Sequence, residues 1–278
     1  MPPIGREVVD LLLAAGEKVR ALSRDPARAA LPTGVEVVQG APSDYAGLVA
    51  ALDGVESVLL VVPGDAKELG RALTESQTRK AVLVSSITAR TRPELAYARH
   101  LRENETLVRA AVPGVTILHP GQFASNALWW QSMVQAGTVR APYGDVAIPV
   151  IDPIDIAAVA AVALVGDEHV GATFTLTGPE RLSPRQKVEV LAEAIRRRVD
   201  FAEVTDEQFR AASPQMGPDL HDYLSALTGS PKPDELELTA TVEQVTGRSP
   251  RTFADWVARN RLAFETPEMQ ASSKENDR

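Results

Sequence analysis

The sequence predicts an α/β fold built on a doubly wound parallel sheet, with a smaller, mostly helical region toward the C-terminus. Between residues 19 and 118, short β-branched apolar runs alternate with helical segments, as in parallel strands joined by crossover helices. Helix-start signals follow several of these runs, which is the second observation behind the prediction. A third observation is that no strand precedes the first helix, so the sheet begins one strand late.

Five apolar runs are expected to form the parallel strands: residues 19–22, 35–38, 57–62, 81–85 and 115–118. They are apolar on both faces because helices cover both sides of a parallel sheet. Capping residues and prolines suited to a first helical turn follow three of them, at Asp25-Pro26, Pro42-Ser43-Asp44 and Pro63-Gly64-Asp65.

The first helix, expected at residues 4–15, has apolar side chains on one face and ends at Gly16. In a dinucleotide-binding, Rossmann-like fold, a strand and a glycine-rich loop come before this helix, whose N-terminal amides face the pyrophosphate. We expect that truncation or a misassigned start removed this strand and most of the loop. The alternative is that the slot closes or another segment fills it, with loss of the cofactor site.

After residue 118 we expect a helix at 121–135, an extended stretch at 147–151, a buried helix at 154–164 and a strand at 172–176. Helices are then expected from Ser183-Pro184 onward and at 206–212, 219–227 and 253–261. These elements suggest a nucleotide-binding domain at 1–182, a smaller substrate-side region at 183–270 and a disordered tail at 271–278.

Composition narrows the classes of function. The chain has 278 residues, with 29 basic and 37 acidic side chains and a formal charge of −8, so nucleic acid is not an expected partner. It has no cysteine, and its four histidines lack metal-ligand spacing, so no metal site is expected. The longest apolar run, 156–165, is about half of a membrane span, and no secretory signal is apparent. We expect a cytoplasmic protein without a membrane partner.

Seven stretches in order resemble the NmrA-like family of atypical short-chain dehydrogenases/reductases. They are residues 4–9 (IGREVV), 19–26 (VRALSRDP), 34–40 (GVEVVQG), 117–123 (ILHPGQF) with Asn126, 151–157 (IDPIDIA), 176–180 (LTGPE) and 245–253 (VTGRSPRTF). The chain departs from the family pattern at Pro2, where a loop glycine is usual, and at Ala41 and His119. The resemblance implies either an NAD(P)H-dependent quinone or azo reductase or a redox-sensing regulator.

Seven residues are expected at the cofactor site: Gly5, Arg24, Val62, Pro63, Ser85, Pro120 and Phe123. Gly5 would allow close approach of the pyrophosphate, unless it is a helix-packing glycine. Arg24, just past the second strand of such a fold, would accept the 2′-phosphate of NADP, so NADP is the expected cofactor and NAD the second choice. Its alternative is a solvated arginine at a helix entry. Ser85 ends a strand where a serine can polarise a carbonyl, although serine is also common at such ends.

No tyrosine is followed four positions later by lysine, so the proton-donating pair of related dehydrogenases is absent. Hydride transfer to a simple ketone is therefore disfavoured, whereas a quinone-like acceptor can spread the incoming charge. Phe123, Asn126 and Trp130 are expected in the substrate pocket, although Phe123 and Trp130 also have the spacing of core residues. No specific catalytic residue is identified.

The leading hypothesis is an NAD(P)H-dependent oxidoreductase acting on an electrophilic small molecule. The alternatives are a non-catalytic NADP sensor that signals through a protein partner and a cofactor-free truncated relative. A homodimer is left open.

Overall fold

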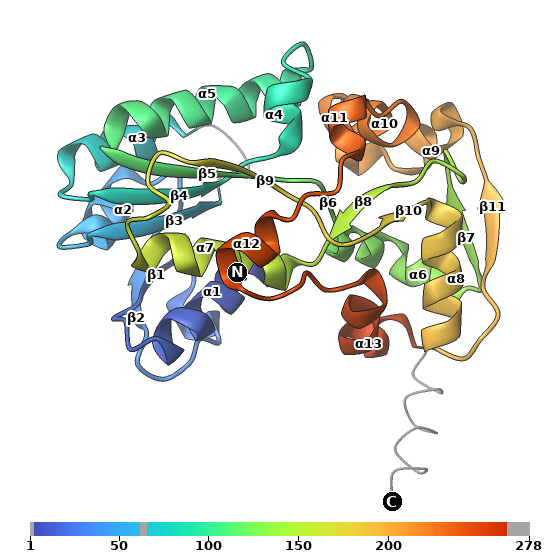
Figure 1. Ribbon diagram of the computed structural model, residues 1–278, viewed down its shortest axis with the longest axis horizontal. Helices are drawn as coiled ribbons and strands as arrows, with labels where there is room; N and C mark the ends of the chain where they lie inside the picture. The colour runs from blue at the N-terminus through green and yellow to red at the C-terminus, as the bar shows by residue number, and fades with distance from the viewer. Residues whose placement is uncertain (1–2, 62–65, 266–278) are drawn as a thin grey trace, which may run out of the picture. The chain divides into compact units, whose positions relative to one another are not determined.

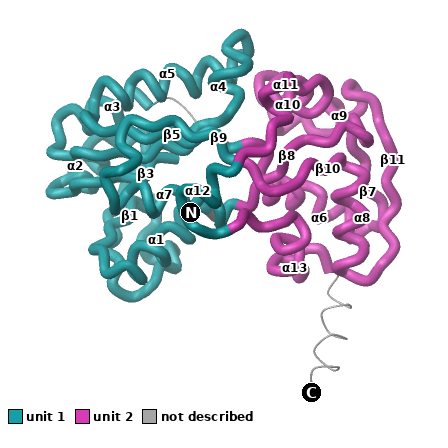
Figure 2. The backbone as a smooth tube through the Cα atoms, in the orientation of Figure 1, with its two compact units in different colours: residues 1–120, 153–176, 240–248 teal, residues 121–152, 177–239, 249–278 magenta. Residues whose placement is uncertain are grey.

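The computed structural model describes residues 3–61 and 66–265, which form two compact units (Figure 2). Unit 1 contains residues 1–120, 153–176 and 240–248, and unit 2 contains residues 121–152, 177–239 and 249–278. The sequence suggests one boundary after residue 182, with each domain a continuous stretch. That division stays a prediction; the two compact units interleave along the chain, and the expected tail at 271–278 lies outside the described residues.

All strands of unit 1 are parallel, which confirms the predicted α/β class. They are β1 (Arg20–Ser23), β2 (Glu36–Gln39), β3 (Ser57–Val61), β4 (Lys80–Val84), β5 (Gly114–Pro120) and β9 (Thr173–Leu176). They form two sheets, β1-β2 and β3-β4-β5-β9. Among the described residues no strand bonds to the second edge of β1 or β3. The sheet is thus divided at the place where a dinucleotide-binding fold has its first strand.

Helices cover both faces of the larger sheet, with α3 and α5 on one side and α1 and α7 on the other (Figure 1). The helices of unit 1 are α1 (Pro3–Ala14), η1 (Pro26–Arg28), α2 (Tyr45–Leu52), α3 (Lys67–Glu75), α4 (Ile87–Thr91), α5 (Ala96–Ala111), α7 (Pro153–Val165) and α12 (Thr241–Thr246). The core under α3 and α5 includes Leu73, Leu83, Val108 and Ile117, each at most 2% exposed. Each such side chain stabilises the fold by about 1.5–3 kcal/mol.

Unit 2 has two small sheets, β10-β8-β6 and the parallel pair β11-β7. Their strands are β6 (Gln122–Phe123), β7 (Thr138–Ala141), β8 (Ile148–Ile151), β10 (Arg181–Leu182) and β11 (Asp200–Glu203). The helices are η2 (Ala124–Trp130), α6 (Gln131–Gln135), α8 (Pro184–Ala194), α9 (Asp206–Ala212), η3 (Pro214–Met216), α10 (Pro218–Gly229), α11 (Pro233–Leu236) and α13 (Phe253–Phe264). In the core, the Trp256 ring stacks on Phe253 with centroids 5.7 Å apart and meets Phe264 edge to face at 6.1 Å.

Several helices of unit 2, α8 and α13 among them, begin with reciprocal caps. Ser183 accepts from the backbone of Gln186 at the start of α8, and Thr252 accepts from Asp255 at the start of α13. The expected helix at 121–135 is replaced by β6, η2 and α6. Its first residues are extended because β6 pairs with β8, which sequence periodicity does not reveal. Within the described chain, no helix is both long and apolar enough to cross a membrane.

Gly178, between β9 and β10, lies against the backbone of β8. Its N–H donates to the Val150 carbonyl at 3.1 Å, and a Cβ on Gly178 would lie 2.1 Å from that oxygen. Because both partners are backbone, neither yields as a flexible side chain would.

We therefore expect Gly178→Ala to lower the free energy of unfolding by about 1–3 kcal/mol in urea titrations. Gly166→Ala is the matched control, since the nearest atom to its added Cβ is 3.6 Å away. Equal stability of the two variants would contradict this packing argument.

Candidate functional site

The carboxyl ends of two neighbouring strands in the larger sheet carry two of the residues expected at a cofactor site. Ser85 follows β4 and is 8% exposed, and its N–H donates to Leu118 of β5 at 2.9 Å. Pro120 is the buried last residue of β5. Ser85 and Pro120 therefore lie at neighbouring strand ends, which is the edge where open α/β sheets bind ligands.

Arg24 follows β1 and is exposed, and it makes no ion pair with any residue that the structure describes. The neighbouring Arg28 differs, because its guanidinium lies 3.6 Å from the Asp25 carboxylate. Arg24 is thus an unneutralised cation just beyond a strand end in the β1-β2 sheet. This arrangement is compatible with binding a phosphate group.

The other expected cofactor residues are less closely defined. Gly5 lies in the first turns of α1, where the preceding Ile4 is buried, rather than in a loop. Phe123 belongs to β6 in unit 2. Val62 and Pro63 lie outside the described residues. The role of all seven as cofactor contacts remains a prediction.

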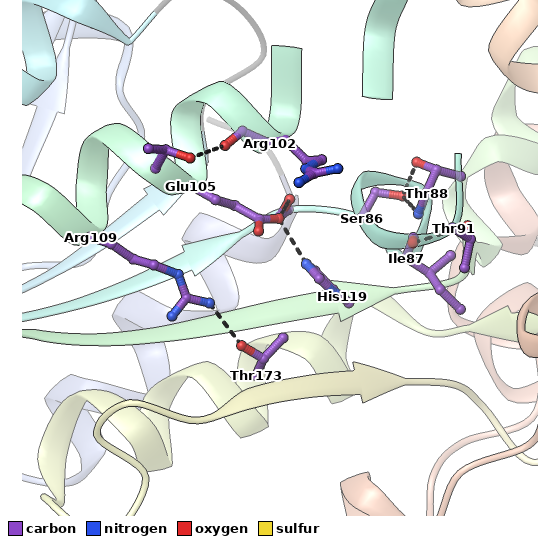
Figure 3. A network of polar contacts seen from close by, with 11 residues as sticks. Ser86, Ile87, Thr88, Thr91, Arg102, Glu105, Arg109, His119 and Thr173 are labelled. Atoms are coloured by element: carbon purple, nitrogen blue, oxygen red, sulfur yellow. Dashed lines mark hydrogen bonds and ion pairs between the residues drawn. The ribbon is translucent and has the colours of Figure 1, made fainter. Parts of the chain in front are cut away.

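Glu105 on α5 contacts side chains at two neighbouring strand ends, and Figure 3 shows its contact with His119. One of its carboxylate oxygens accepts from Ser85 Oγ at 2.5 Å and lies 2.8 Å from His119 Nε2. Burial raises the pKa of Glu105, but the hydrogen bonds from His119 and Ser85 outweigh it, so the pKa lies below its usual value. His119 Nδ1 is buried and has no hydrogen-bond partner among the described residues.

This network restrains the chemistry available to Ser85. Its hydroxyl donates to a carboxylate, so in this arrangement the Ser85 proton is not directed at a substrate carbonyl. Glu105 was not among the residues predicted from the sequence. The signal was its place on α5, seven residues after buried Ala98 and three before buried Val108, because this spacing turns it toward the sheet.

A cavity that opens to solvent lies within unit 2. Phe123, Asn126 and Trp130, the three residues expected in the substrate pocket, all line it. Their role in substrate binding remains a prediction.

Lys187 on α8 also lines this cavity, although it is only 6% exposed. Its ammonium donates to the Gln122 side-chain oxygen, and burial lowers the pKa of Lys187 to about 7. Lys187 was not among the residues predicted from the sequence. The available signal was its helical phase, since Lys187 lies next to buried Val188 and four residues before buried Leu191.

The described residues contain no cluster of side chains suited to bind a metal ion. No group of three or more histidine, aspartate or glutamate side chains there is close enough together to hold an ion.

The Glu105 network predicts a pH-dependent loss of stability. Because folding lowers the pKa of Glu105, its contribution is present above the unfolded-state pKa, about 4, and is lost as pH falls through the folded value. We expect Glu105→Gln to lower the free energy of unfolding at pH 7 by about 1–3 kcal/mol, with a smaller difference below about pH 4. Urea unfolding at both pH values measures it.

The control is Glu103→Gln on the same helix, whose carboxylate side chain is 60% exposed. A loss of similar size in the control would show that the Glu105 contacts are not responsible.

Comparison with known proteins places this arrangement in a family. A family model described as NAD(P)H-binding matches residues 3–165. The chain is 36% identical over 271 residues to a (4-alkanoyl-5-oxo-2,5-dihydrofuran-3-yl)methyl phosphate reductase from Streptomyces griseus, covering 94% of this chain and 95% of the relative. It is 33% identical to an NAD(P)H azoreductase from Xenophilus azovorans, with 94% and 96% covered.

Solved structures of reductases have the same fold as this chain. An NADPH-dependent quinone oxidoreductase from Escherichia coli superposes with a TM-score of 0.78 at 26% identity, covering 93% of this chain and 96% of the other. The triphenylmethane reductase of Citrobacter sp., solved with NADP(H), has the same fold, with a TM-score of 0.78 at 16% identity and 94% and 97% covered. By these matches, the chain is a member of the NAD(P)H-binding family, among the NmrA-like reductases that its sequence resembles.

Proposed function

We propose that the protein is an NAD(P)H-dependent oxidoreductase that transfers hydride to a quinone-like or other electrophilic small molecule. The observation that carries this proposal is its 36% identity, over nearly the whole of both chains, to a protein named as a reductase. The azoreductase and quinone oxidoreductase relatives support the same class of reaction. No comparable observation favours a non-catalytic sensor or a cofactor-free protein.

The residues present fit an NADP-type dinucleotide at one point in particular. Arg24 is exposed and lacks a carboxylate partner in the described chain, at the end of the strand where a 2′-phosphate would be recognised. A guanidinium suits this group because it offers several N–H donors in one plane. Ser85 and Pro120 would lie at the same edge of the larger sheet. We therefore propose NADP as the preferred cofactor and NAD as a weaker one.

When bound, the nicotinamide supplies the hydride. The chain has no lysine four residues after any of Tyr45, Tyr97, Tyr143 or Tyr223, so it lacks the paired phenol that would protonate an alkoxide. The Ser85 hydroxyl is held by Glu105 and does not replace this donor. An acceptor that delocalises the incoming charge needs no strong acid beside its oxygen, which favours conjugated substrates.

The test of this proposal is a comparison of two acceptors. We expect purified protein to oxidise NADPH in the presence of menadione, followed by loss of NADPH absorbance, but not in the presence of cyclohexanone. Equal turnover of the simple ketone would show that an unrecognised proton donor exists. Binding of NADPH without turnover of any acceptor would instead support a sensor.

Cofactor choice gives a second test. We expect Arg24→Ala to raise the KM for NADPH about tenfold or more, since a charged hydrogen bond contributes about 1.5–3 kcal/mol, and to leave the KM for NADH nearly unchanged. Steady-state kinetics with both dinucleotides measures it.

Arg198→Ala is the matched control, because Arg198 is an exposed arginine of unit 2 that pairs with Asp200 at 2.8 Å. An equal change for NADPH and NADH in Arg24→Ala would remove Arg24 from the recognition of the phosphate.

A further inference from the structure

The cavity of unit 2 is predominantly apolar and aromatic. Phe123, Trp129, Trp130, Phe209 and Phe253 contribute rings to its lining. Polar side chains are few, and they are Gln122, Asn126, Lys187 and Thr228. Lys187 is thus the single charged residue in the described lining, which contains no carboxylate.

The position of Lys187 separates it from an ordinary surface lysine. Its side chain is 6% exposed. Lys187 lies near the start of α8, which begins directly after the cap at Ser183. An ammonium has three N–H donors, and Gln122 is its one hydrogen-bond partner among the described residues. Gln122 supplies a neutral oxygen, so the positive charge has no counter-charge.

Charged groups on the elements around Lys187 do not supply one. Those on α8 and α13 are Arg185, Glu189, Glu193, Asp255, Arg259 and Arg261, and those on β10, β11, α9 and α10 include Arg181, Asp200, Glu203, Asp206, Arg210 and Asp222. None of them lines the cavity, and burial alone accounts for the shift of the Lys187 pKa. Several are paired with each other, as Arg185 is with Glu203 and Arg210 is with Asp222.

A buried ammonium without a carboxylate is unfavourable, because it has lost hydration without gaining an opposite charge. The lowered pKa, about 7, expresses this cost. An oxyanion placed in the cavity would supply the missing charge and accept an unused N–H. Aromatic side chains around it would bury the rest of a flat ligand.

We propose that this cavity binds a flat, conjugated small molecule carrying one negatively charged oxygen, which pairs with Lys187 Nζ. The inference deepens the proposed function, on which it rests, by giving the electron acceptor an ionised hydroxyl or carboxylate. It assigns Lys187 a role in substrate recognition. Gln122 is then a positioning residue that holds the ammonium in place when the cavity is empty.

The charge balance favours a monoanion. One ammonium neutralises one negative charge, whereas a phosphate monoester carries about 1.5–2 charges at neutral pH. The remaining polar lining groups, Asn126 and Thr228, are neutral. A phosphate in this cavity would leave charge uncompensated in an apolar setting.

The experiment measures binding without dinucleotide, by isothermal titration calorimetry. The probes are lawsone, a hydroxynaphthoquinone that is ionised at neutral pH, and its methyl ether, which has the same rings but no charge. We expect wild-type protein at pH 6.5 to bind lawsone at least about tenfold more tightly than the ether, corresponding to about 1.4 kcal/mol. Naphthyl phosphate should bind more weakly than lawsone.

The pH dependence has a defined sign. Lawsone stays ionised over pH 6–9, so its affinity follows protonation of Lys187 in the free protein. Above about pH 7 the affinity should fall, approaching tenfold per pH unit, while affinity for the ether stays constant.

Two variants separate charge from shape. Lys187→Met should abolish both the preference for lawsone and its pH dependence. Lys187→Arg should retain the preference and lose the pH dependence, because a guanidinium stays protonated throughout this range. Lys18→Met, at an exposed lysine of unit 1, is the control and should behave as wild type.

Equal affinities for lawsone and its ether in wild type, or a preference that survives in Lys187→Met, would overturn the inference. The wild-type pH series needs no variant to fold, so it decides the matter alone if a substitution unfolds the protein. Because no dinucleotide is present, a negative result here leaves NADPH oxidation with menadione intact. Absence of that turnover with normal lawsone binding would contradict the proposed function alone.

Discussion

Unit 1 depends on the burial of α7, a helix with almost no polar side chains. Ile156, Ala157, Val159 and Ala160 are all fully buried, and the helix contacts α1 and α12 as well as β3, β4 and β5. Parallel strands need such cover on both faces, since they are apolar on both sides. The apolar face of α1 then packs against α7, so the first helix of the chain is held although the sheet is divided beside it.

The buried charged side chains Glu105 in unit 1 and Lys187 in unit 2 have opposite surroundings. In unit 1, the Glu105 carboxylate is buried between strand ends, and donors from Ser85 and His119 favour its charged form. In unit 2, the Lys187 ammonium meets only a neutral amide, and its charged form is disfavoured. A satisfied buried charge mainly fixes structure, whereas an unsatisfied one beside a cavity has interaction energy left for a ligand.

Much of the fold could be predicted because parallel strands leave a strong local pattern. The six observed strands of unit 1 begin within about one residue of their expected positions, and α8 begins at the capping signal of Ser183. The interleaving of the units could not be predicted, because no change of composition marks Pro120 or Asp152. Glu105 and Lys187 were missed for a related reason. A charged residue on a helix is ordinarily solvated, and only tertiary packing decides whether its phase turns it inward.

The division of the chain also has a consequence for its modularity. The backbone passes from one unit to the other five times, at 120/121, 152/153, 176/177, 239/240 and 248/249. Neither unit is therefore a transferable module, since no single cut in the gene separates one complete unit from the other. A gene fusion that joined two complete domains end to end would not produce this interleaved order of segments. Successive insertions into the connections of an ancestral sheet would produce it directly.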